Sequence, residues 1–235
     1  FSFHRTFRDK RTMTSPAEIL VVFDCDGTLV DSAHNVIACM QKAFQEAGLP
    51  IPDDLSIRRT IGLNPDVAVR DLAGRPLSFA QLDEIVTGYK TSFFHQRLQI
   101  DHHEPLFSGV RHVLEALAAR HVNMAVATGK SMRGVNAVIA QHGLEGYFGS
   151  LQTPDHNPGK PHPQMLEKAM AVAGVRPERT FMVGDTSFDM MLAKNAGCRA
   201  IGVSWGYHDE AELRESGAER IIDYFEELIG IVEAA

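Results

Sequence analysis

The sequence contains few cysteines, a single tryptophan and no long hydrophobic segment. Its three cysteines are too few and too scattered along 235 residues for a disulfide framework or a zinc site. No apolar run approaches the ~20 residues that a helix needs to span a bilayer. These absences argue against a disulfide-stabilised secreted domain and against an integral membrane protein, and we expect a reducing, cytoplasmic setting.

The chain also contains fewer basic than acidic side chains. The net charge is −7, from 23 basic and 30 acidic side chains. A surface of this sign offers no basic footprint for nucleic acid and would repel polyanions at long range. Hydrophobic residues at 44% and charged residues at 23% are ordinary for a globular chain that is long enough to bury its own core. We therefore expect no nucleic-acid or membrane partner, and either a monomer or a homodimer.

The first residues differ in composition from the rest of the chain. Residues 1–12 contain four basic side chains and one acidic side chain; without them the net charge is −10, from 19 basic minus 29 acidic residues. The stretch has no apolar segment of the kind found in a secretory signal, although an arginine-rich leader can serve as a targeting peptide. We interpret residues 1–16 as an extension that is disordered or remains from expression or upstream translation.

Short apolar segments of strand length recur along the chain. They are Ile19–Phe23, Met124–Ala127, Phe181–Val183 and Ala200–Val203. Between the later ones, apolar residues recur at helical spacing, and glycines at 143, 174 and 197 stand where those helices should end. Alternating strands and helices predict a parallel sheet covered by helices on both faces, an α/β fold with a Rossmann-like core.

The segment after the first strand breaks this alternation, because it contains helix signals and no convincing strand. Ser78, followed three residues later by Gln81, is the signature of a capping box at the start of a helix. Asn64 before Pro65 marks another helix start, at which we expect the asparagine side chain to act as the cap.

The length of this helical segment predicts a separate domain. A single crossover helix between two parallel strands needs far fewer residues. We therefore predict a small α-helical domain inserted over residues 33–102, with the α/β core formed by residues 17–32 and 103–235. The predicted hinges lie near the two ends of this insert, and we expect the histidines at its second end to lie on the surface.

Two acids directly follow the first strand. In an open parallel sheet, ligands bind beyond the carboxyl ends of the strands. Asp24 and Asp26 therefore reach the same edge together, and Gly27 permits a sharp turn after them. Two adjacent carboxylates repel unless a cation or a proton lies between them, which indicates a metal and a division of roles. The alternative is that the acids only cap the next helix, which is common for a single Asp-Gly but less so for two acids after five apolar residues.

The second predicted strand is followed by Thr128, Gly129, Lys130 and Ser131. A phosphate-binding P-loop would need a further glycine at position 124, where this chain has Met124, so we reject that interpretation. A strand-end threonine before a helix start can instead offer its hydroxyl and backbone N–H groups to a phosphoryl oxygen. By itself this signal is weak, because Ser and Thr cap many helices.

Two further elements complete the pattern. Lys160 lies in a loop stiffened by three prolines, which presents one long cationic side chain from a restrained backbone, although an isolated lysine is usually an ordinary surface residue. Asp185 ends another strand, and Asp189 follows one helical turn later. Carboxylate oxygens, together with water and phosphate oxygens, are the ligands that Mg²⁺ prefers.

Taken in order, these motifs resemble the haloacid dehalogenase-like superfamily of hydrolases. The resemblance rests on DxDGT at Asp24–Thr28, the strand-end Thr128, Lys160 in its proline-rich loop, and GDxxxD at Gly184–Asp189. It covers essentially the whole chain from residue 19 onward. The helical insert after the first motif resembles the group that carries a helical cap at this point, and the first and last motifs look most similar to those of phosphoglycolate phosphatases.

The resemblance implies a two-step displacement at phosphorus. Asp24 would attack the phosphorus atom and become an aspartyl phosphate. Asp26 would protonate the leaving oxygen and then accept a proton from the water that cleaves the intermediate. Thr128, Gly129 and Lys160 would bind the phosphoryl oxygens, and Lys160 would also offset charge that builds up in the transition state.

The resemblance also implies a Mg²⁺ site and a role for the insert. The ion would be bound by the carboxylate of Asp24, the backbone carbonyl of Asp26 and the carboxylate of Asp185, with Asp189 either near the metal or holding Lys160. The cap would close over the site, exclude water and select the substrate.

Within the cap, a few residues are candidates for contact with the substrate. Gly62 and Asn64, in the loop before the Pro65 helix, are the main candidates, and Arg58, Arg59 and Lys90 are weaker ones. Such charged residues are more often ordinary solvated side chains.

The acid at position 26 limits which leaving groups the enzyme is expected to accept. Dehalogenases of this superfamily replace it because a halide leaving group needs no proton, and phosphonate-cleaving relatives have alanine there. Asp26 therefore favours an oxygen leaving group. We expect hydrolysis of a small phosphorylated metabolite, with 2-phosphoglycolate as the best single candidate. Pyrophosphate, nucleotide or sugar-phosphate hydrolysis, or a sugar phosphomutase, are alternatives on the same scaffold.

A third interpretation is a receiver-like signalling module, in which a partner reads the phosphorylated aspartate. The long insert and the acid at Asp26 argue against it, because a signalling phosphate should persist.

Cys25, between the two acids, should point to the opposite face of the strand, and we expect it to be a packing residue. The eleven histidines show no spacing typical of a metal site on a helix.

Overall fold

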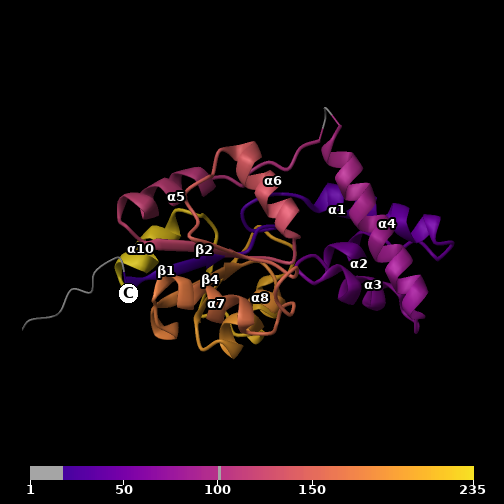
Figure 1. Cartoon of the computed structure of the whole chain (residues 1–235). Helices are drawn as coiled ribbons and strands as arrows, with labels where there is room; N and C mark the ends of the chain where they lie inside the picture. Colours follow the sequence, from indigo (N-terminus) through magenta and orange to yellow (C-terminus); the bar gives the residue numbers. More distant parts are fainter. Residues whose placement is uncertain (1–17, 100–101) are drawn as a thin grey trace, which may run out of the picture.

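A computed structural model of the chain describes residues 18–99 and 102–235, so the predicted N-terminal extension over residues 1–16 lies outside the described residues. The described chain forms an α/β unit with a group of helices at one end of its sheet (Figure 1). The predicted α/β fold with a Rossmann-like parallel-sheet core and an inserted helical cap is confirmed.

The core is one sheet of six parallel strands in the order β3-β2-β1-β4-β5-β6. The strands are β1 (Leu20–Phe23), β2 (Asn123–Ala127), β3 (Ser150–Gln152), β4 (Thr180–Gly184), β5 (Arg199–Val203) and β6 (Arg220–Ile222). All four predicted strands are present. The two edge strands, β3 and β6, were not predicted, because each has only three residues and carries little of the apolar pattern of a central strand.

Helices cover both faces of the sheet, as predicted. They are α5 (Val110–Ala119), α6 (Met132–His142), α7 (Gln164–Ala173), α8 (Ser187–Asn195), α9 (Glu210–Glu215) and α10 (Glu227–Glu233). Figure 1 shows α5, α6 and α10 on one side of the sheet and α7 and α8 on the other. Apolar residues of β1 alternate between the two layers, with Val21 and Phe23 in the core beneath α5 and Leu20 and Val22 in the core beneath α7.

Glycines end two of these helices as the sequence predicted. Gly143 and Gly174 follow α6 and α7 with φ of +59° and +68°, the left-handed conformation that glycine adopts without a steric penalty.

The insert consists of α1 (Ala33–Glu46), α2 (Asp54–Arg58), α3 (Pro65–Ala73) and α4 (Phe79–Arg97), with no strand over residues 33–99. These helices surround their own buried apolar cluster, in which Phe44, Ile57 and Ile85 are almost fully covered. A separate core of this kind is what distinguishes a domain from a long loop. The boundaries predicted for the cap and the core stay a prediction.

The two predicted helix starts in the cap have different outcomes. Ser78 and Gln81 form the predicted capping box at the start of α4. Asn64 precedes α3, with Pro65 in its first turn, but its side chain makes no capping hydrogen bond, so that part of the prediction is wrong. Its side chain lies against the core instead, as described below.

The two connections between core and cap run side by side. The backbone N–H of Asp31 donates to the carbonyl of Pro105 at 2.9 Å, and the backbone N–H of Phe107 donates to the carbonyl of Leu29 at 3.0 Å.

The expectation that the histidines at the second end of the insert lie on the surface is wrong for His102. Its side chain is 6% exposed, because it packs 3.4 Å from a carboxylate oxygen of Glu104.

None of the helices within the described residues combines the length and the apolar character that would be needed to cross a membrane.

Candidate active site

Polar side chains stand at the carboxyl ends of three neighbouring strands. Asp24 follows β1, Thr128 follows β2, and Asp185 follows β4, and all three are fully buried. Because β1 pairs in parallel with both β2 and β4, these strand ends meet at one edge of the sheet. This is where an open α/β sheet binds its ligands.

Lys160 connects two of the acids. Its Nζ atom lies 2.8 Å from Oδ1 of Asp24 and 2.6 Å from Oδ1 of Asp189. The other carboxylate oxygen of Asp189 accepts hydrogen bonds from Thr186, at 2.7 Å from the hydroxyl and 3.1 Å from the backbone N–H. Asp189 therefore orients Lys160, and Thr186 at the start of α8 orients Asp189.

Three carboxylates lie together at this edge. One oxygen from each of Asp24, Asp185 and Asp189 lies within 4.8 Å of the others. Burial raises the pKa of Asp24 to about 7 against the opposing effect of Lys160, and burial followed by repulsion from Asp24 raises that of Asp185 well above its ordinary value. Oδ2 of Asp24 is buried and has no hydrogen-bond partner within the described residues.

The charge of this cluster favours a cation. When all three carboxylates are ionised, they stand against the ammonium group of Lys160, which leaves two negative charges in a buried space. Buried charge of this kind is stabilised only by protons or by a counter-ion. An oxygen-only donor set with an unpartnered oxygen suits a hard divalent cation such as Mg²⁺.

Asp185 is held rigidly. Its Oδ1 accepts a hydrogen bond from the hydroxyl of Thr28 at 2.8 Å, and its Oδ2 accepts one from the backbone N–H of Tyr207 at 3.0 Å. Two glycines leave room for it: a Cβ at Gly206 would lie 2.0 Å from the Cβ of Asp185, and a Cβ at Gly27 would lie 2.2 Å from its Oδ2. Only glycine fits at these two positions while the carboxylate stays in place.

Asp26 has partners of its own, separate from the three-acid cluster. Its Oδ1 accepts hydrogen bonds from the hydroxyl of Ser32 at 2.5 Å and from Nζ of Lys130 at 2.7 Å. Burial alone would raise the pKa of Asp26, but the attraction of Lys130 and the two hydrogen bonds outweigh it and hold this pKa below its ordinary value.

Lys130 is a site residue that the sequence did not identify. It pairs with Glu104 as well as Asp26, at 3.0 Å, and its Nζ lies 5.1 Å from the ring centroid of Phe93 in the cap. Lys130 belongs to the Gly-Lys-Ser triplet that we rejected as a P-loop. The triplet is visible in the sequence, but nothing local to it shows that its lysine pairs with Asp26 and Glu104. Glu104 is 1% exposed and lies within the second predicted hinge, near residues 102–106, where no motif marked it.

The residues predicted to bind substrate meet where the cap contacts the core. Gly129 follows Thr128, and a Cβ at Gly129 would lie 2.6 Å from the carbonyl oxygen of Gly62 in the cap. A Cβ at Gly159 would lie 2.3 Å from Oδ1 of Asn64. The cap loop that contains Gly62 and Asn64 therefore lies directly over both core loops, next to Lys160.

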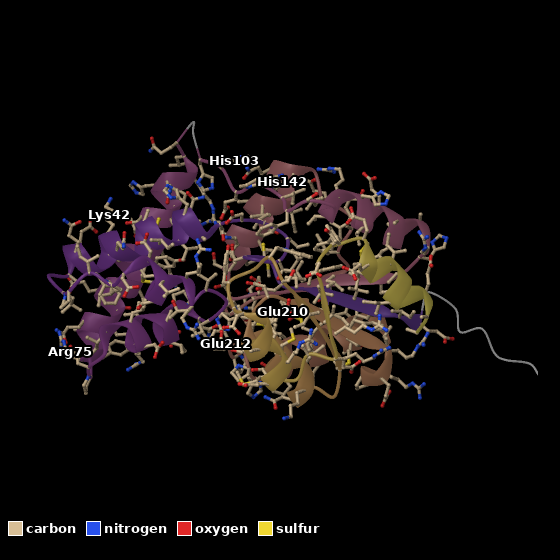
Figure 2. The ribbon with its side chains drawn as sticks, turned by 180° about the vertical axis from the view of Figure 1, so that it is seen from behind. Lys42, Arg75, His103, His142, Glu210 and Glu212 are labelled. Atoms are coloured by element: carbon tan, nitrogen blue, oxygen red, sulfur yellow. The ribbon has the colours of Figure 1, made fainter. Side chains whose placement is uncertain are left out.

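Further contacts join the cap to the core beside β5. The side chain of Arg59 pairs with Glu212, its carbonyl oxygen lies 3.1 Å from Nε2 of His208, and the guanidinium of Arg58 lies over the ring of Tyr207. Figure 2 shows Glu212 at the seam where the cap meets the core. Arg58 and Arg59 thus contact the core.

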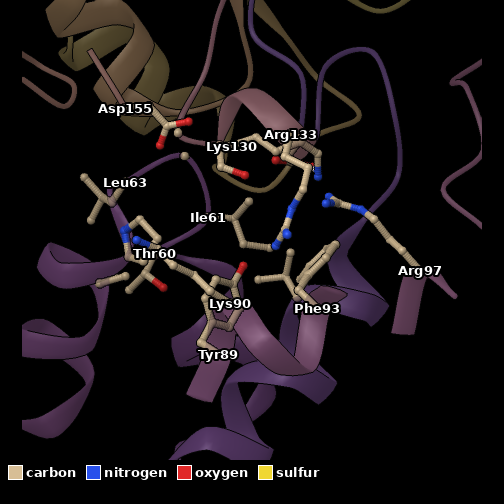
Figure 3. Close-up of a pocket in the computed structure, with 17 residues that line it drawn as sticks. Thr60, Ile61, Leu63, Tyr89, Lys90, Phe93, Arg97, Lys130, Arg133 and Asp155 are labelled. Carbon is tan, nitrogen blue, oxygen red and sulfur yellow. The ribbon is translucent and has the colours of Figure 1, made fainter. Parts of the chain in front are cut away.

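A pocket of about 300 Å³ lies between the cap and the core (Figure 3). Its core side is lined by Asp26, Gly129, Lys130, Ser131, Arg133 and Asp155, and its cap side by Val36, Thr60, Ile61, Gly62, Leu63, Pro65, Ala68, Tyr89, Lys90, Phe93 and Arg97. Gly62 and Lys90 are among the predicted contacts that line the pocket. Asn64 is not in the lining, because its side chain is directed at Gly159.

The predicted packing role of Cys25 agrees with the structure. Its side chain is 1% exposed and packs with Val30, Val126, Val135 and Val138 on the face away from the acids. Within the described residues, the cluster of acids that lie close enough to share a metal contains no histidine.

Comparison with known proteins identifies similar sequences. The family described as haloacid dehalogenase-like hydrolase matches residues 21–203 of this chain. The protein named probable phosphatase IndB from Dickeya dadantii is 35% identical over 219 residues, which cover 92% of this chain and 94% of that protein. A phosphoglycolate phosphatase from Vibrio vulnificus is 30% identical over 228 residues, which cover 94% of this chain and 98% of that protein.

Solved structures have the same fold. The crystal structure of a predicted phosphoglycolate phosphatase from Haemophilus somnus is similar with a TM-score of 0.80 and 25% identity, over 92% of this chain and 98% of that one. A hydrolase from Pseudomonas syringae is similar with a TM-score of 0.81 at 22% identity, over the same shares of the two chains, which supports the fold alone.

Proposed function

The chain belongs to the haloacid dehalogenase-like hydrolase family and is a phosphatase of that family, and on this premise we propose that it hydrolyses a small phosphorylated metabolite through an aspartyl phosphate on Asp24, with Mg²⁺ as cofactor. One observation carries the proposal. A buried carboxylate with an unpartnered oxygen lies beside one lysine and two further acids, at the edge of the sheet where ligands bind.

Asp24 is the nucleophile in this proposal. Its Oδ2 attacks phosphorus and forms an O–P bond while the bond from phosphorus to the leaving oxygen breaks. A carboxylate attacks only when it is ionised, and burial opposes ionisation here. Lys160, at 2.8 Å from Oδ1, favours the ionised form and keeps the carboxylate in one orientation.

Asp26 moves the proton. It gives a proton to the departing oxygen in the first step, and in the second it takes one from the water that attacks the aspartyl phosphate. Asp26 lines the pocket between cap and core, where the leaving group would sit. Lys130 and Ser32 hold its carboxylate on that side and favour its ionised form, so Asp26 has to take up a proton when the ester binds, from Lys130 or from solvent, before it can give one to the leaving oxygen.

The non-bridging oxygens of the phosphoryl group would be bound from the core. Thr128 and Gly129 follow β2 and present a hydroxyl and backbone N–H groups, and Lys160 supplies the positive charge. Charge accumulates on these oxygens during the transfer, so donors that are already fixed in place stabilise the transition state more than the ground state.

The residues at the carboxyl ends of the strands fit Mg²⁺. The carboxylates of Asp24 and Asp185 and the backbone carbonyl of Asp26 would hold the ion, while Asp189 holds Lys160 through its hydrogen bond. When bound, Mg²⁺ would neutralise the negative charge of the cluster and of the phosphoryl oxygens and so allow the two to approach.

On the evidence of the relatives alone, the best single candidate for the substrate is 2-phosphoglycolate, because several relatives of this length are phosphoglycolate phosphatases. The pocket is larger than glycolate requires, so nucleotides and sugar phosphates remain alternative substrates. A receiver-like role has no support from the family, which is one of hydrolases. A cytoplasmic location and a monomeric or dimeric state stay predictions.

The proposal is tested by trapping the intermediate. The protein would be mixed with acetyl phosphate and Mg²⁺, quenched in acid within milliseconds and digested for mass spectrometry. We expect a phosphate adduct on the peptide that contains Asp24, and free phosphate that accumulates on further incubation. Turnover without any adduct at Asp24 would contradict the covalent mechanism, and an adduct that persists for minutes would favour the receiver-like role.

A further inference from the structure

The pocket between cap and core contains more positive charge than the proposed chemistry uses. Its lining includes four cationic side chains, Lys90, Arg97, Lys130 and Arg133, and two acids, Asp26 and Asp155. Lys130 is already paired with Asp26 and Glu104. Lys90 and Arg133 have no ion pair within the described residues, and Arg97 has only a long one, so these three can contact a ligand. With four cations against two acids, the lining carries a net positive charge.

Arg97 comes from the end of the cap helix α4 and reaches the core. A Cβ at Gly134, in the first turn of α6, would lie 3.0 Å from its Nη2. Its guanidinium lies 4.6 Å from the ring centroid of Phe93, and its Nε is buried without a hydrogen-bond partner. The carboxylate paired with it, on Glu104, is 3.9 Å away and is shared with Lys130. The donors of Arg97 are therefore incompletely used.

Arg133 approaches the same space from the core helix α6. Its guanidinium lies 4.5 Å from the ring centroid of Phe94, and it has no ion pair within the part of the chain that the structure describes. Figure 3 shows the side chains of Arg97 and Arg133 directed toward one another above Phe93. Two guanidinium groups that converge from different domains repel each other unless an anion lies between them.

Much of the rest of the pocket wall is apolar, although Thr60 and Ser131 also line it. Ile61, Leu63, Tyr89 and Phe93 line it on the cap side (Figure 3). Asp24, Thr128 and Lys160 are not part of the lining, so the phosphoryl group would occupy space in addition to the pocket volume of about 300 Å³. That volume is at the lower end of the range for pockets that bury a whole small ligand. Glycolate, a carboxylate on one methylene group, would leave much of it to water.

We propose that this phosphatase prefers phosphate monoesters whose leaving group carries a second anionic group on an apolar body larger than glycolate, and that Arg97 and Arg133 bind that anion. The inference rests on the proposed function, because it places the leaving group beside Asp26. Guanidinium groups bind carboxylates and phosphates through paired, charge-assisted hydrogen bonds. Contact with Phe93 and Phe94 holds their planes in place, so little side-chain freedom is lost on binding.

The test compares matched esters. Propyl phosphate has a neutral leaving group, 3-phosphonooxypropanoate adds a carboxylate, and propane-1,3-diol bisphosphate adds a second phosphate. 2-Phosphoglycolate and 4-phosphonooxybutanoate vary the length between the two anions. For each ester, kcat/KM would be measured with Mg²⁺ for the wild type, Arg97→Gln, Arg133→Gln and the control Arg70→Gln. Arg70 is an exposed residue of α3 outside the pocket lining.

The decisive quantity is the ratio of kcat/KM for an anionic ester to that for propyl phosphate. We expect the wild-type ratio to exceed about tenfold, and each pocket variant to lower it by about tenfold or more, as is typical for the loss of a hydrogen bond to a charged group. Arg70→Gln should keep the wild-type ratio. The anionic ester with the higher ratio identifies the second anion as a carboxylate or a phosphate, and either supports the proposal.

Some outcomes would overturn the inference. A wild-type ratio near one, or a ratio unchanged in both pocket variants, would show that the arginines do not bind the leaving group. Higher kcat/KM for 2-phosphoglycolate than for its longer homologues would overturn the size requirement. Arg133 is exposed, so its variant should fold even if Arg97→Gln does not. If the wild type fails to hydrolyse acetyl phosphate, the proposed function itself fails; hydrolysis of acetyl phosphate with a ratio near one overturns the inference alone.

Discussion

The two sides of the candidate active site are built in different ways. At the carboxyl ends of the strands, Asp24, Lys160 and Asp189 are buried and hold one another in place. On the cap side of the pocket, Lys90 is exposed and has no ion pair within the described residues. The core side suits a group that is the same in every substrate, the phosphoryl group. The cap side presents a wider, partly apolar surface, which suits a leaving group that varies.

The largest expected effect concerns the core side. Asp24→Asn keeps the size of the side chain but removes its ability to attack phosphorus, so turnover should fall by at least about a thousandfold. The fold should persist, because the change removes a buried charge. Phosphate release measures the first effect and circular dichroism the second. Wild-type turnover in a folded variant would contradict the mechanism.

Removal of the metal should affect the core side almost as strongly. EDTA should abolish phosphate release, and excess Mg²⁺ should restore it. Ca²⁺ should restore little, because it prefers a larger and more variable oxygen shell. Asp185→Asn should need more Mg²⁺ for half-maximal activity or be inactive. A wild type that resists EDTA would show that the cluster of acids does not hold an essential cation.

Lys130 lies between the two sides, and its removal should affect stability as well as turnover. Lys130→Met leaves Asp26 and Glu104 buried without their shared ammonium group, so we expect a loss of about 3 kcal/mol in the free energy of unfolding, measured by urea denaturation. The control Lys90→Met, at an exposed position in the same pocket, should change stability by less than about 0.5 kcal/mol. Equal stability of the two variants would show that the buried network contributes nothing.

Without metal, the stability of the core should depend on pH through Asp24. Burial raises its pKa from 3.8 to about 7 in the folded protein, so between these values the folded form binds a proton that the unfolded form has lost. The stabilising contribution is therefore complete below about pH 4 and is lost as the pH rises toward 7. In EDTA, stability relative to Asp24→Asn should fall by on the order of 3 kcal/mol across this window.

The control for this pH dependence is Mg²⁺, which binds the ionised carboxylate and should remove most of the decline. Urea denaturation at several pH values measures both curves. Parallel curves for the wild type and Asp24→Asn in EDTA would show that this pKa is not raised.

The smallest expected effect concerns the cap loop. Gly62→Ala places a side chain at a backbone φ of +100°, and Asn64→Ala removes the side chain that lies against Gly159. Each should change kcat/KM by about two- to tenfold and unequally across several phosphate esters, while hydrolysis of acetyl phosphate, which has a small leaving group, changes less. A uniform shift for all substrates, or none, would show that this loop does not select the substrate.

The sequence was most informative where the chemistry depends on short segments. Asp24, Asp185 and the strands that precede them could be predicted, because a buried strand shows in a run of apolar residues and parallel strands end at one edge. The edge strands β3 and β6 were missed because three residues with partly exposed side chains leave too little pattern to detect.

Contacts between distant segments could not be predicted in the same way. Lys130 is 104 residues from Asp26 in the sequence and 26 from Glu104, and only the folded chain brings the three together. The side chain of Asn64 illustrates the same limit. A local rule assigned it to a helix cap, but in the folded protein it contacts a glycine of another domain.

The paired connections between core and cap have a consequence for how such proteins diversify. The chain leaves the core at Leu29–Asp31 and returns at Pro105–Phe107, and backbone hydrogen bonds hold the two passages together. To the core, the whole insert is therefore one closed loop with its ends already adjacent, and the free energy of closing such a loop grows only slowly with its length. Evolution can lengthen, shorten or exchange the insert at this junction while the strands that carry the phosphoryl chemistry keep their register.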